Sequence, residues 1–475
     1  MADTIKKGIV WFRNDLRLHD NEALCDALSH AHEIIPIYIF DERTFLEKTR
    51  YGFAKTGAFR AQFIIESVQN LRKNLRNRGS ELIVRVGKPE EIITDIARKE
   101  KTSWIYCNRE RTKEEVVVQD TLEENLWSIG QEVRYSRGKM LYYTADLPFP
   151  VTHTPDTFSS FRKEVEKFTQ IRQPLPVPDF LGKWIFDIEA GDIPQLSDFG
   201  LELNISDSDP ILKGGETEAL ARVDYYFSEK KLASNYFNTR NESFGTDFST
   251  RFSAYLAQGC LSPKYLYQQL KTYENKYGSN KSTYWIYFEL LWRDFFRLIA
   301  KKYKEKVFLR GGTKGVADLS SSEDKALFLK WANGQTGYPF IDASMRQLKA
   351  TGFMSNRGRQ NVASFLIHDL GLNWQMGAYY FESMLVDYDP CSNYGNWNYL
   401  AGVGCDPREG RKFNVLLQSR KYDPEAKFIR QWCPELSQLS NKDIHVPFEL
   451  SDEELKSQGV ELGKDYPRPM VEFSY

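Results

Sequence analysis

The sequence predicts two structured domains, an amino-terminal α/β domain of Rossmann-like type and an all-helical domain, joined by a long linker. Over residues 1–133, short apolar runs alternate with helical segments, which is typical of a parallel sheet covered by helices. From residue 211 to residue 475, apolar residues recur at helical spacing instead. Residues 134–210 fit neither pattern, and we expect them to form the linker.

Four strands and two helices of the first domain can be placed in order. The strands are short apolar runs and the helices are amphipathic: strands at 8–12, 33–40, 81–86 and 103–107, and helices at 21–31 and 59–78. The second helix ends before Gly79, a residue that commonly terminates helices. Neither the glycine pattern of dinucleotide-binding folds nor that of nucleoside triphosphatases follows the first strand. Both classes of function are therefore disfavoured.

The linker is rich in proline, aspartate and other polar residues. The proline-rich stretch 173–178 predicts a stiff connector, and we expect little regular structure between residues 134 and 210. The second domain is predicted to contain these helical segments: 216–231, 261–274, 283–304, 323–333, 341–350, 356–370 and 374–386.

Composition excludes several classes of protein. The 65 acidic and 64 basic residues give a net charge of −1, so any binding of nucleic acid must come from a local basic patch. None of the six cysteines forms a Cys-x-x-Cys pair, which argues against a zinc site or a disulfide framework. The chain has no signal-like start and no apolar run of membrane-spanning length. We expect a cytoplasmic monomer without a metal and without a membrane partner.

Two segments look like neither ordinary core nor ordinary surface. In the first, 352–361, the side chains of Asn356, Arg359 and Gln360 share one helix face because of their spacing. The second, 387–399, combines two carboxylates with amides and aromatic rings. Polar groups beside flat rings suit a planar heteroaromatic ligand that also forms hydrogen bonds.

These segments resemble the flavin-binding helical domain of the photolyase/cryptochrome family. The run Met-Ser-Asn-Arg-Gly-Arg-Gln at 354–360 is similar to that of its DASH branch. The resemblance extends from residues 11–17 to residues 428–432. It implies a parallel five-stranded sheet, FAD in the helical domain, and repair of cyclobutane pyrimidine dimers by electron transfer from excited reduced FAD. Two alternatives stay open, a photoreceptor that signals through partners without repair and a nucleic-acid-binding module with a vestigial flavin.

The resemblance also assigns the FAD contacts. Hydroxyls and a cation at a helix start suit a pyrophosphate, although a plain helix cap explains the same pattern. The resemblance implies that the FAD phosphates contact Tyr236, Ser249, Thr250, Arg251, Phe252 and Ser253. Beside the flavin ring, Arg359 would pair with Asp387, Asp389 would meet the pyrimidine edge or the ribityl chain, and Asn393 would face N5. The alternative for the two aspartates is a solvated turn before Pro390.

The expected DNA contacts come from the same resemblance. Glu289, Trp292 and Arg293 share a helix face, which also fits a salt bridge over a packed tryptophan. The resemblance implies that Glu289 binds the dimer, that Trp292 stacks on it and that Arg293 faces DNA, with Asn356 and Asn393 completing the catalytic set. The other expected DNA contacts are Arg357, Gln360, Tyr399 and Arg411. Gln360 and Tyr399 make the dimer pocket more polar than in duplex-repairing relatives, which favours single-stranded DNA.

Two further expectations concern electron transfer and light capture. Trp397 and Trp374 match the first two members of the family's electron relay, although each could equally be a core residue. The third position holds Ser321, so another aromatic residue is expected to complete the relay. Glu114 matches the glutamate that binds the antenna 5,10-methenyltetrahydrofolate, and its alternative is a solvated helix start.

Overall fold

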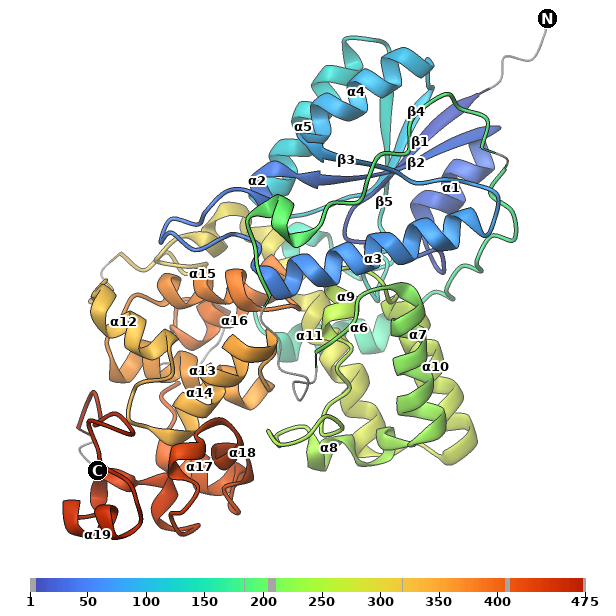
Figure 1. The fold of residues 1–475 in the computed structure, drawn as a ribbon. Coiled ribbons are helices and arrows are strands. Elements are labelled where there is room, and N and C mark those ends of the chain that lie inside the picture. The colour runs from blue at the N-terminus through green and yellow to red at the C-terminus, as the bar shows by residue number, and fades with distance from the viewer. Residues whose placement is uncertain (1–5, 183, 204–210, 318, 406–410, 473–475) are drawn as a thin grey trace, which may run out of the picture.

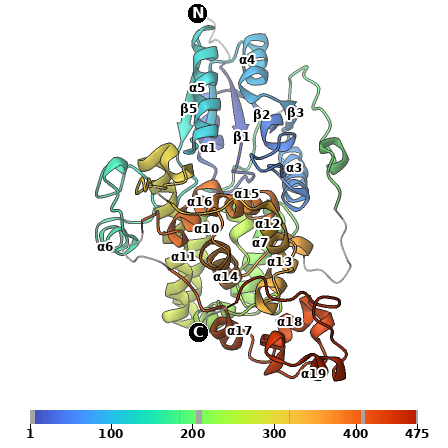
Figure 2. The ribbon, with the colours of Figure 1, turned by 90° about the vertical axis from the view of Figure 1, so that its left-hand side faces the viewer.

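A computed structural model describes residues 6–182, 184–203, 211–317, 319–405 and 411–472. The molecule consists of a sheet domain and a helical domain, with α3 (Ala58–Arg76) running between them (Figure 1). Seen from the side, the sheet domain stacks on the helical domain, and the carboxy-terminal helices lie farthest from the sheet (Figure 2).

The amino-terminal domain contains the predicted parallel five-stranded sheet. Its strands are β1 (Lys7–Phe12), β2 (Glu33–Asp41), β3 (Ile83–Gly87), β4 (Trp104–Asn108) and β5 (Glu132–Ser136), in the order β3-β2-β1-β4-β5. All four neighbouring pairs are parallel. The boundary expected at residue 133 falls inside β5. This edge strand is only half-buried, so it lacks the apolar run that marks the other four strands.

The two faces of the sheet pack against different helices because side chains alternate along a strand. Ile9 and Trp11 of β1 pack with α4 (Pro89–Glu100) and α5 (Lys113–Trp127) in one apolar cluster. Val10 and Phe12 belong to a second cluster with α1 (Glu22–His30) and α3. The second cluster continues into the helical domain, so the domains share a core.

The linker is more regular than the sequence predicts. It contains α6 (Phe158–Phe168), whose first turn is capped by the Thr157 hydroxyl accepting from the Ser160 amide at 3.3 Å. Phe158, Phe161 and Val165 recur at helical spacing and are buried. Most of the described linker lies outside helices and strands, as expected, and α6 is the main exception, because the expectation rested on composition and overlooked this apolar face.

The second domain is helical, as predicted, and several boundaries differ from the expected ones. Its helices are α7 (Glu216–Asp224), α8 (Tyr236–Thr239), α9 (Ser253–Ala257), α10 (Pro263–Tyr277), α11 (Lys281–Tyr303), α12 (Lys325–Ala332), α13 (Pro339–Thr351), α14 (Asn356–Ser364), α15 (Trp374–Met384), α16 (Pro390–Leu400), α17 (Val415–Tyr422), α18 (Lys427–Trp432) and α19 (Asp452–Ser457). The expected segments 216–231 and 356–370 each divide into an α-helix and a following π-helical turn.

Candidate active site

A pocket opens between α14, α15 and α16. Its cavity volume is about 100 Å³, and it is partly open to solvent. The predicted site residues that line it are Asn356, Arg359, Gln360, Asp387, Asp389, Asn393 and Trp397. The structure therefore brings together residues from both of the segments that the sequence singles out.

Two helix caps fix the polar side chains of the pocket. The Ser355 hydroxyl caps α14 by accepting from the Gly358 amide at 3.1 Å. The Asp389 carboxylate caps α16 by accepting from the Ser392 amide at 2.8 Å. Asp387 and Asp389 are only 9% and 8% exposed. A solvated turn before Pro390 is therefore the wrong interpretation of these two aspartates.

Arg359 and Asp387 form the predicted pair. The guanidinium donates to Asp387 Oδ2 at 2.8 Å and to the Met354 carbonyl at 2.9 Å. Asp387 Oδ1 and Gln360 Oε1 are buried and have no hydrogen-bond partner within the described part of the chain. A buried acceptor left in this state costs about 1–3 kcal/mol. Both residues line the pocket, so a ligand with N–H or O–H donors fits it.

Asp389 belongs to a charge network that crosses the domain boundary. Arg297 of α11 donates to Asp389 Oδ2 at 2.7 Å and to Glu110 Oε2 of the sheet domain at 3.2 Å. Burial raises the pKa of Asp389, but Arg297 and Arg293 outweigh burial, so its pKa lies below the ordinary value. Asp389 therefore stays ionised. Arg297 is too far from these partners in sequence to be found by pattern alone.

Arg293 does not face open solvent. Its guanidinium donates to the carbonyls of Lys139 at 2.7 Å and Leu256 at 3.1 Å. The side chain is 12% exposed. We therefore withdraw Arg293 as a DNA contact. The helix face that it shares with Glu289 is covered at this point by the linker and by the segment around Leu256.

Glu289 stands at a less buried part of the same helix. Its side chain is 35% exposed and forms an ion pair with Arg240. Burial raises the pKa of Glu289, and Arg240 acts in the opposite direction. The Arg240 guanidinium also lies 4.5 Å from the ring centroid of Trp285. Arg240 was not predicted as a site residue, although it lies in the segment that contains Tyr236.

Trp292 has one face covered. Its ring stacks on Phe158 of α6 with the centroids 3.7 Å apart and the planes at 6°. Tyr399 of α16 meets Trp292 edge-on at 6.0 Å, and the Arg411 guanidinium lies 4.3 Å from the Tyr399 ring. The predicted stacking of a base on Trp292 is restricted to the part of the ring that Phe158 does not cover.

The predicted phosphate segment lies before α9. The Ser249 and Thr250 carbonyls accept from Arg222 at 3.2 and 3.0 Å, and sequence reasoning missed Arg222. Arg251 has a positive φ of 56°, a strained conformation that is typical of functional positions. Burial lowers its pKa to about 10. Phe252 is buried and Ser253, the first residue of α9, is exposed.

One phenylalanine connects this segment to the pocket. The Arg251 guanidinium lies 4.7 Å from the Phe353 ring, and the Arg359 guanidinium lies 5.7 Å from the same ring. Tyr236 is buried elsewhere, near Glu289 and Arg240. Ligand phosphates at residues 249–253 would therefore lie one aromatic ring away from the pocket.

Asn356 of the predicted catalytic set and Arg357, a predicted DNA contact, lie on the first turn of α14. Asn356 is exposed at the pocket lining. Arg357 donates to Asn241 Oδ1 at 3.0 Å, and its guanidinium lies 4.6 Å from the Tyr422 ring.

The two tryptophans predicted to form the relay are buried, and Trp397 lines the pocket. Trp397 and Trp374 are 2% and 3% exposed. Gly377 leaves room for Trp397, because a Cβ there would lie 2.2 Å from Cη2 of the ring. The Trp374 indole donates to the Arg310 carbonyl at 2.9 Å, and the Arg310 guanidinium donates to Ser321 Oγ at 2.7 Å. The third relay position is thus close to Trp374 but carries no aromatic ring.

A row of tyrosines begins beside Trp374. Ring centroids are 6.2 Å apart between Trp374 and Tyr394, 6.0 Å between Tyr394 and Tyr379, and 5.6 Å between Tyr379 and Tyr51. The Tyr51 hydroxyl donates to Glu323 at 3.1 Å. Sequence reasoning could not identify this row, because Tyr51 belongs to the other domain.

Glu114 occupies the first turn of α5 and is 76% exposed, with Lys55 at 2.8 Å. This arrangement fits the folate contact and the solvated helix start equally well. Within the described residues, no group of three potential metal ligands gathers. In the same part of the chain, every helix is too short or too polar to cross a membrane.

Two family models match the chain. One is DNA photolyase, over residues 8–179, and the other is the FAD binding domain of DNA photolyase, over residues 285–475. Cryptochrome DASH of Gloeobacter violaceus is 48% identical over 469 residues, which cover 98% of this chain and 93% of that protein. Cryptochrome DASH of Xenopus laevis is 45% identical over 467 residues, covering 98% of this chain and 89% of that protein.

Solved structures agree in fold. The Synechocystis cryptochrome superposes with a TM-score of 0.96 at 46% identity, covering 99% of this chain and 98% of that one. A class III photolyase from Agrobacterium tumefaciens gives 0.86 at 30% identity, covering 99% and 95%. Similarity of this extent reaches both domains and every predicted site segment. The chain therefore belongs to the photolyase/cryptochrome family, in its DASH branch, and its helical domain binds FAD.

Proposed function

We propose that this protein repairs cyclobutane pyrimidine dimers in DNA, with a preference for single strands, under blue or near-ultraviolet light. FAD, when bound and reduced, supplies the chemistry by giving one electron to the dimer after absorbing light and by taking it back once the ring has split. The observation that carries the proposal is the position of α16. Its Asn393 lines the pocket, and its Tyr399 meets Trp292 of α11.

The pocket residues suit a flavin. Arg359 is held in place by Asp387, and the free oxygens of Asp387 and Gln360 are acceptors for ligand N–H or O–H groups. Asn393 donates to the Ala378 carbonyl at 3.0 Å, which fixes its amide. We infer that this amide would face N5 of a bound flavin. Because an amide supplies no acidic proton, it favours the anionic reduced cofactor that repair needs. Arg251 and its neighbours would hold the phosphates.

The dimer would bind beside Glu289, Trp292, Asn356 and Tyr399. Glu289 is anchored by Arg240, and we propose that it hydrogen-bonds the dimer and stabilises its radical anion. Phe158 covers one face of Trp292, so less aromatic surface is left to offset the cost of flipping a dimer out of a duplex. This restriction, together with the polar Gln360, supports the preference for single-stranded DNA.

Arg357 and Arg411 are the remaining candidates for phosphate contacts of the DNA. Each is positioned by an aromatic ring, Tyr422 for Arg357 and Tyr399 for Arg411. For the antenna, we propose 5,10-methenyltetrahydrofolate beside Glu114. The Lys55–Glu114 ion pair would then open or rearrange when the folate binds.

For photoreduction of the oxidised cofactor, we propose that Tyr394, Tyr379 and Tyr51 follow Trp397 and Trp374. In the last step, one electron moves from Tyr51 toward Trp374 and the phenolic proton passes to Glu323. Hydrogen bonds from Asn373 and Tyr51, among other contacts, keep the pKa of Glu323 below its ordinary value, so this carboxylate can accept the proton. An external thiol would then reduce the tyrosyl radical.

The decisive assay illuminates the purified, reduced protein with dimer-containing oligonucleotides, single-stranded and duplex. We expect repair of both, faster on single strands, and none in the dark. Glu289→Ala should lower the repair yield while FAD stays bound, whereas Glu305→Ala, an exposed acid just beyond α11, should leave it unchanged. A protein that binds FAD but repairs neither substrate would favour the signalling photoreceptor instead.

A further inference from the structure

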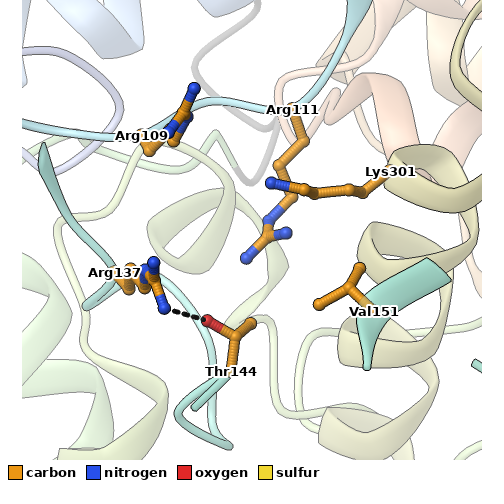
Figure 3. Close-up of a pocket in the computed structure, with 6 residues that line it drawn as sticks. All are labelled: Arg109, Arg111, Arg137, Thr144, Val151 and Lys301. Atoms are coloured by element: carbon orange, nitrogen blue, oxygen red, sulfur yellow. Dashed lines mark hydrogen bonds between the residues drawn. The ribbon is translucent and has the colours of Figure 1, made fainter. Parts of the chain in front are cut away.

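A second hollow lies where the sheet domain, the linker and α11 meet. Its cavity volume is about 120 Å³, and it is partly open to solvent. The residues that line it are Arg109, Arg111, Arg137, Thr144, Val151 and Lys301. Four of these six side chains are cations and none is an acid. Figure 3 shows the ends of Arg111 and Lys301 side by side, with Arg137 hydrogen-bonded to Thr144 across from them. None of the six lines the flavin pocket.

The hollow lies at an edge of the sheet where ligands commonly bind. Arg109 directly follows β4 and Arg137 directly follows β5. In parallel α/β sheets, ligands bind outside the carboxyl ends of the strands, near the point where the strand order reverses. Here the order reverses between β1 and β4. That point is filled by the chain itself, through contacts of Asn108 with Asp15 and of Lys139 with Glu110. The open space lies next to it.

Three of the four cations have only weak partners. Arg111 donates to the Met140 sulfur at 3.2 Å, Arg137 donates to the Thr144 hydroxyl at 3.5 Å, and the Arg109 guanidinium lies 4.9 Å from the Tyr135 ring. Within the described ranges, none of the four forms an ion pair with a carboxylate, although Glu22 accepts from the backbone N–H of Arg137. By contrast, the nearby Lys139 and Arg297 each pair with an acid.

The cations repel one another. Burial lowers the pKa of Lys301, and Arg111, Arg109 and Arg137 lower it further. Burial also lowers the pKa of Arg111 to about 10. Both effects mean that the charged forms are less stable here than in water. A bound anion would offset this repulsion, because every surrounding cation would attract it.

We propose that this hollow binds a small organic phosphate that carries at least two negative charges, such as a pyrophosphate or a nucleotide. Guanidinium groups bind phosphate oxygens in pairs, and the ammonium of Lys301 adds a point charge. Several cations around one concave space favour a compact polyanion over a single carboxylate. A small ligand fits better than single-stranded DNA, because protein bounds the hollow on several sides. These sides are the ends of β4 and β5, residues 144–151 and α11.

The test uses the full-length, flavin-loaded protein and isothermal titration calorimetry. The probes are inorganic pyrophosphate, ADP and an undamaged single-stranded oligonucleotide, each at two salt concentrations. We expect pyrophosphate and ADP to bind, and to bind more weakly at the higher salt concentration. Lys301→Met and Arg111→Met should each lower the affinity roughly tenfold or more. The control Lys99→Met removes an exposed cation from α4 of the same domain and should change nothing.

Thermal unfolding separates a binding role from a structural one. Without phosphate, Lys301→Met should unfold at the same temperature as the wild type or higher, because the variant relieves repulsion. Pyrophosphate should raise the unfolding temperature of the wild type but hardly that of the variant. The proposal is overturned if neither probe binds, if both variants bind as tightly as the wild type, or if only the oligonucleotide binds and only its binding is lost in the variants.

Discussion

Charges are arranged in opposite ways in the pocket proposed for the flavin and in the basic hollow, although α11 contributes to the surroundings of both. At the pocket, Arg297 and Arg359 are each paired with an aspartate. At the hollow, Lys301 lies one helical turn beyond Arg297 and faces three arginines. Paired charges hold side chains in one geometry for a neutral or weakly charged ring. A cluster of like charges instead needs an oppositely charged ligand from solution to balance it.

The largest effect on stability should come from breaking the ion pairs of Arg297 beside the pocket. Arg297→Met would leave Asp389 and Glu110 buried without the arginine that both carboxylates share, although Glu110 keeps its ion pair with Lys139. Removing one partner of a buried pair costs about 3–5 kcal/mol. We expect that loss in the free energy of unfolding, measured by chemical denaturation.

A matched surface variant is Arg162→Met, which breaks the partly exposed pair with Glu166. It should cost less than about 1 kcal/mol. If Arg297→Met costs no more than this control, the charge network does not hold the pocket together. Arg111→Met sharpens the contrast, because it should cost little in the absence of a phosphate ligand.

Local sequence patterns predicted most of the fold and part of the candidate site. Four strands were found from their apolar runs, and the residues of α14 and α16 were found because each site segment is continuous. Arg297 and Arg240 could not be found, because their partners lie in other parts of the chain. The basic hollow was missed for the same reason, since its four cations come from three separate segments. Long-range pairing leaves no local pattern.

The second prediction concerns Glu382, a buried acid near both the pocket and Glu114. Its side chain is 8% exposed, and the hydroxyl of Tyr394 donates to it at 3.4 Å. Burial raises its pKa to about 7, Arg60 and Lys55 lower it, and Glu114 raises it. Tyr388 also faces this carboxyl. Glu382 is therefore largely protonated in the folded protein below neutral pH.

The direction of the pH effect follows from this shift. Because the folded pKa exceeds the ordinary value of 4.5, Glu382 destabilises the fold progressively as the pH rises from about 4.5 through 7. A change of this size corresponds to about 3 kcal/mol. Glu382→Gln should remove this part of the pH dependence, so that the variant gains stability relative to the wild type above pH 7. Denaturation series at several pH values measure it, and parallel curves for the two proteins would contradict the assignment.

The last prediction concerns electron flow between the pocket and the surface, which we propose to run through aromatic rings. Trp397→Phe should abolish photoreduction of the oxidised protein under blue light, measured by flavin absorbance with a thiol present. Tyr51→Phe should slow it and remove the transient tyrosyl signal, because phenylalanine cannot be oxidised in place of tyrosine. Tyr277→Phe, at the distant end of α10, should have no effect.

Ser321→Trp should change the rate little, because Tyr394, Tyr379 and Tyr51 already connect Trp374 to Glu323 at the surface. The new indole would also displace the hydrogen bond between Arg310 and the Ser321 hydroxyl, which sits directly beside Trp374. A many-fold faster photoreduction in this variant would mean that the relay ends at Trp374 in the natural protein. The tyrosine row would then be a packing feature of α15 and α16, and the photochemistry would depend on reduction of FAD from solution.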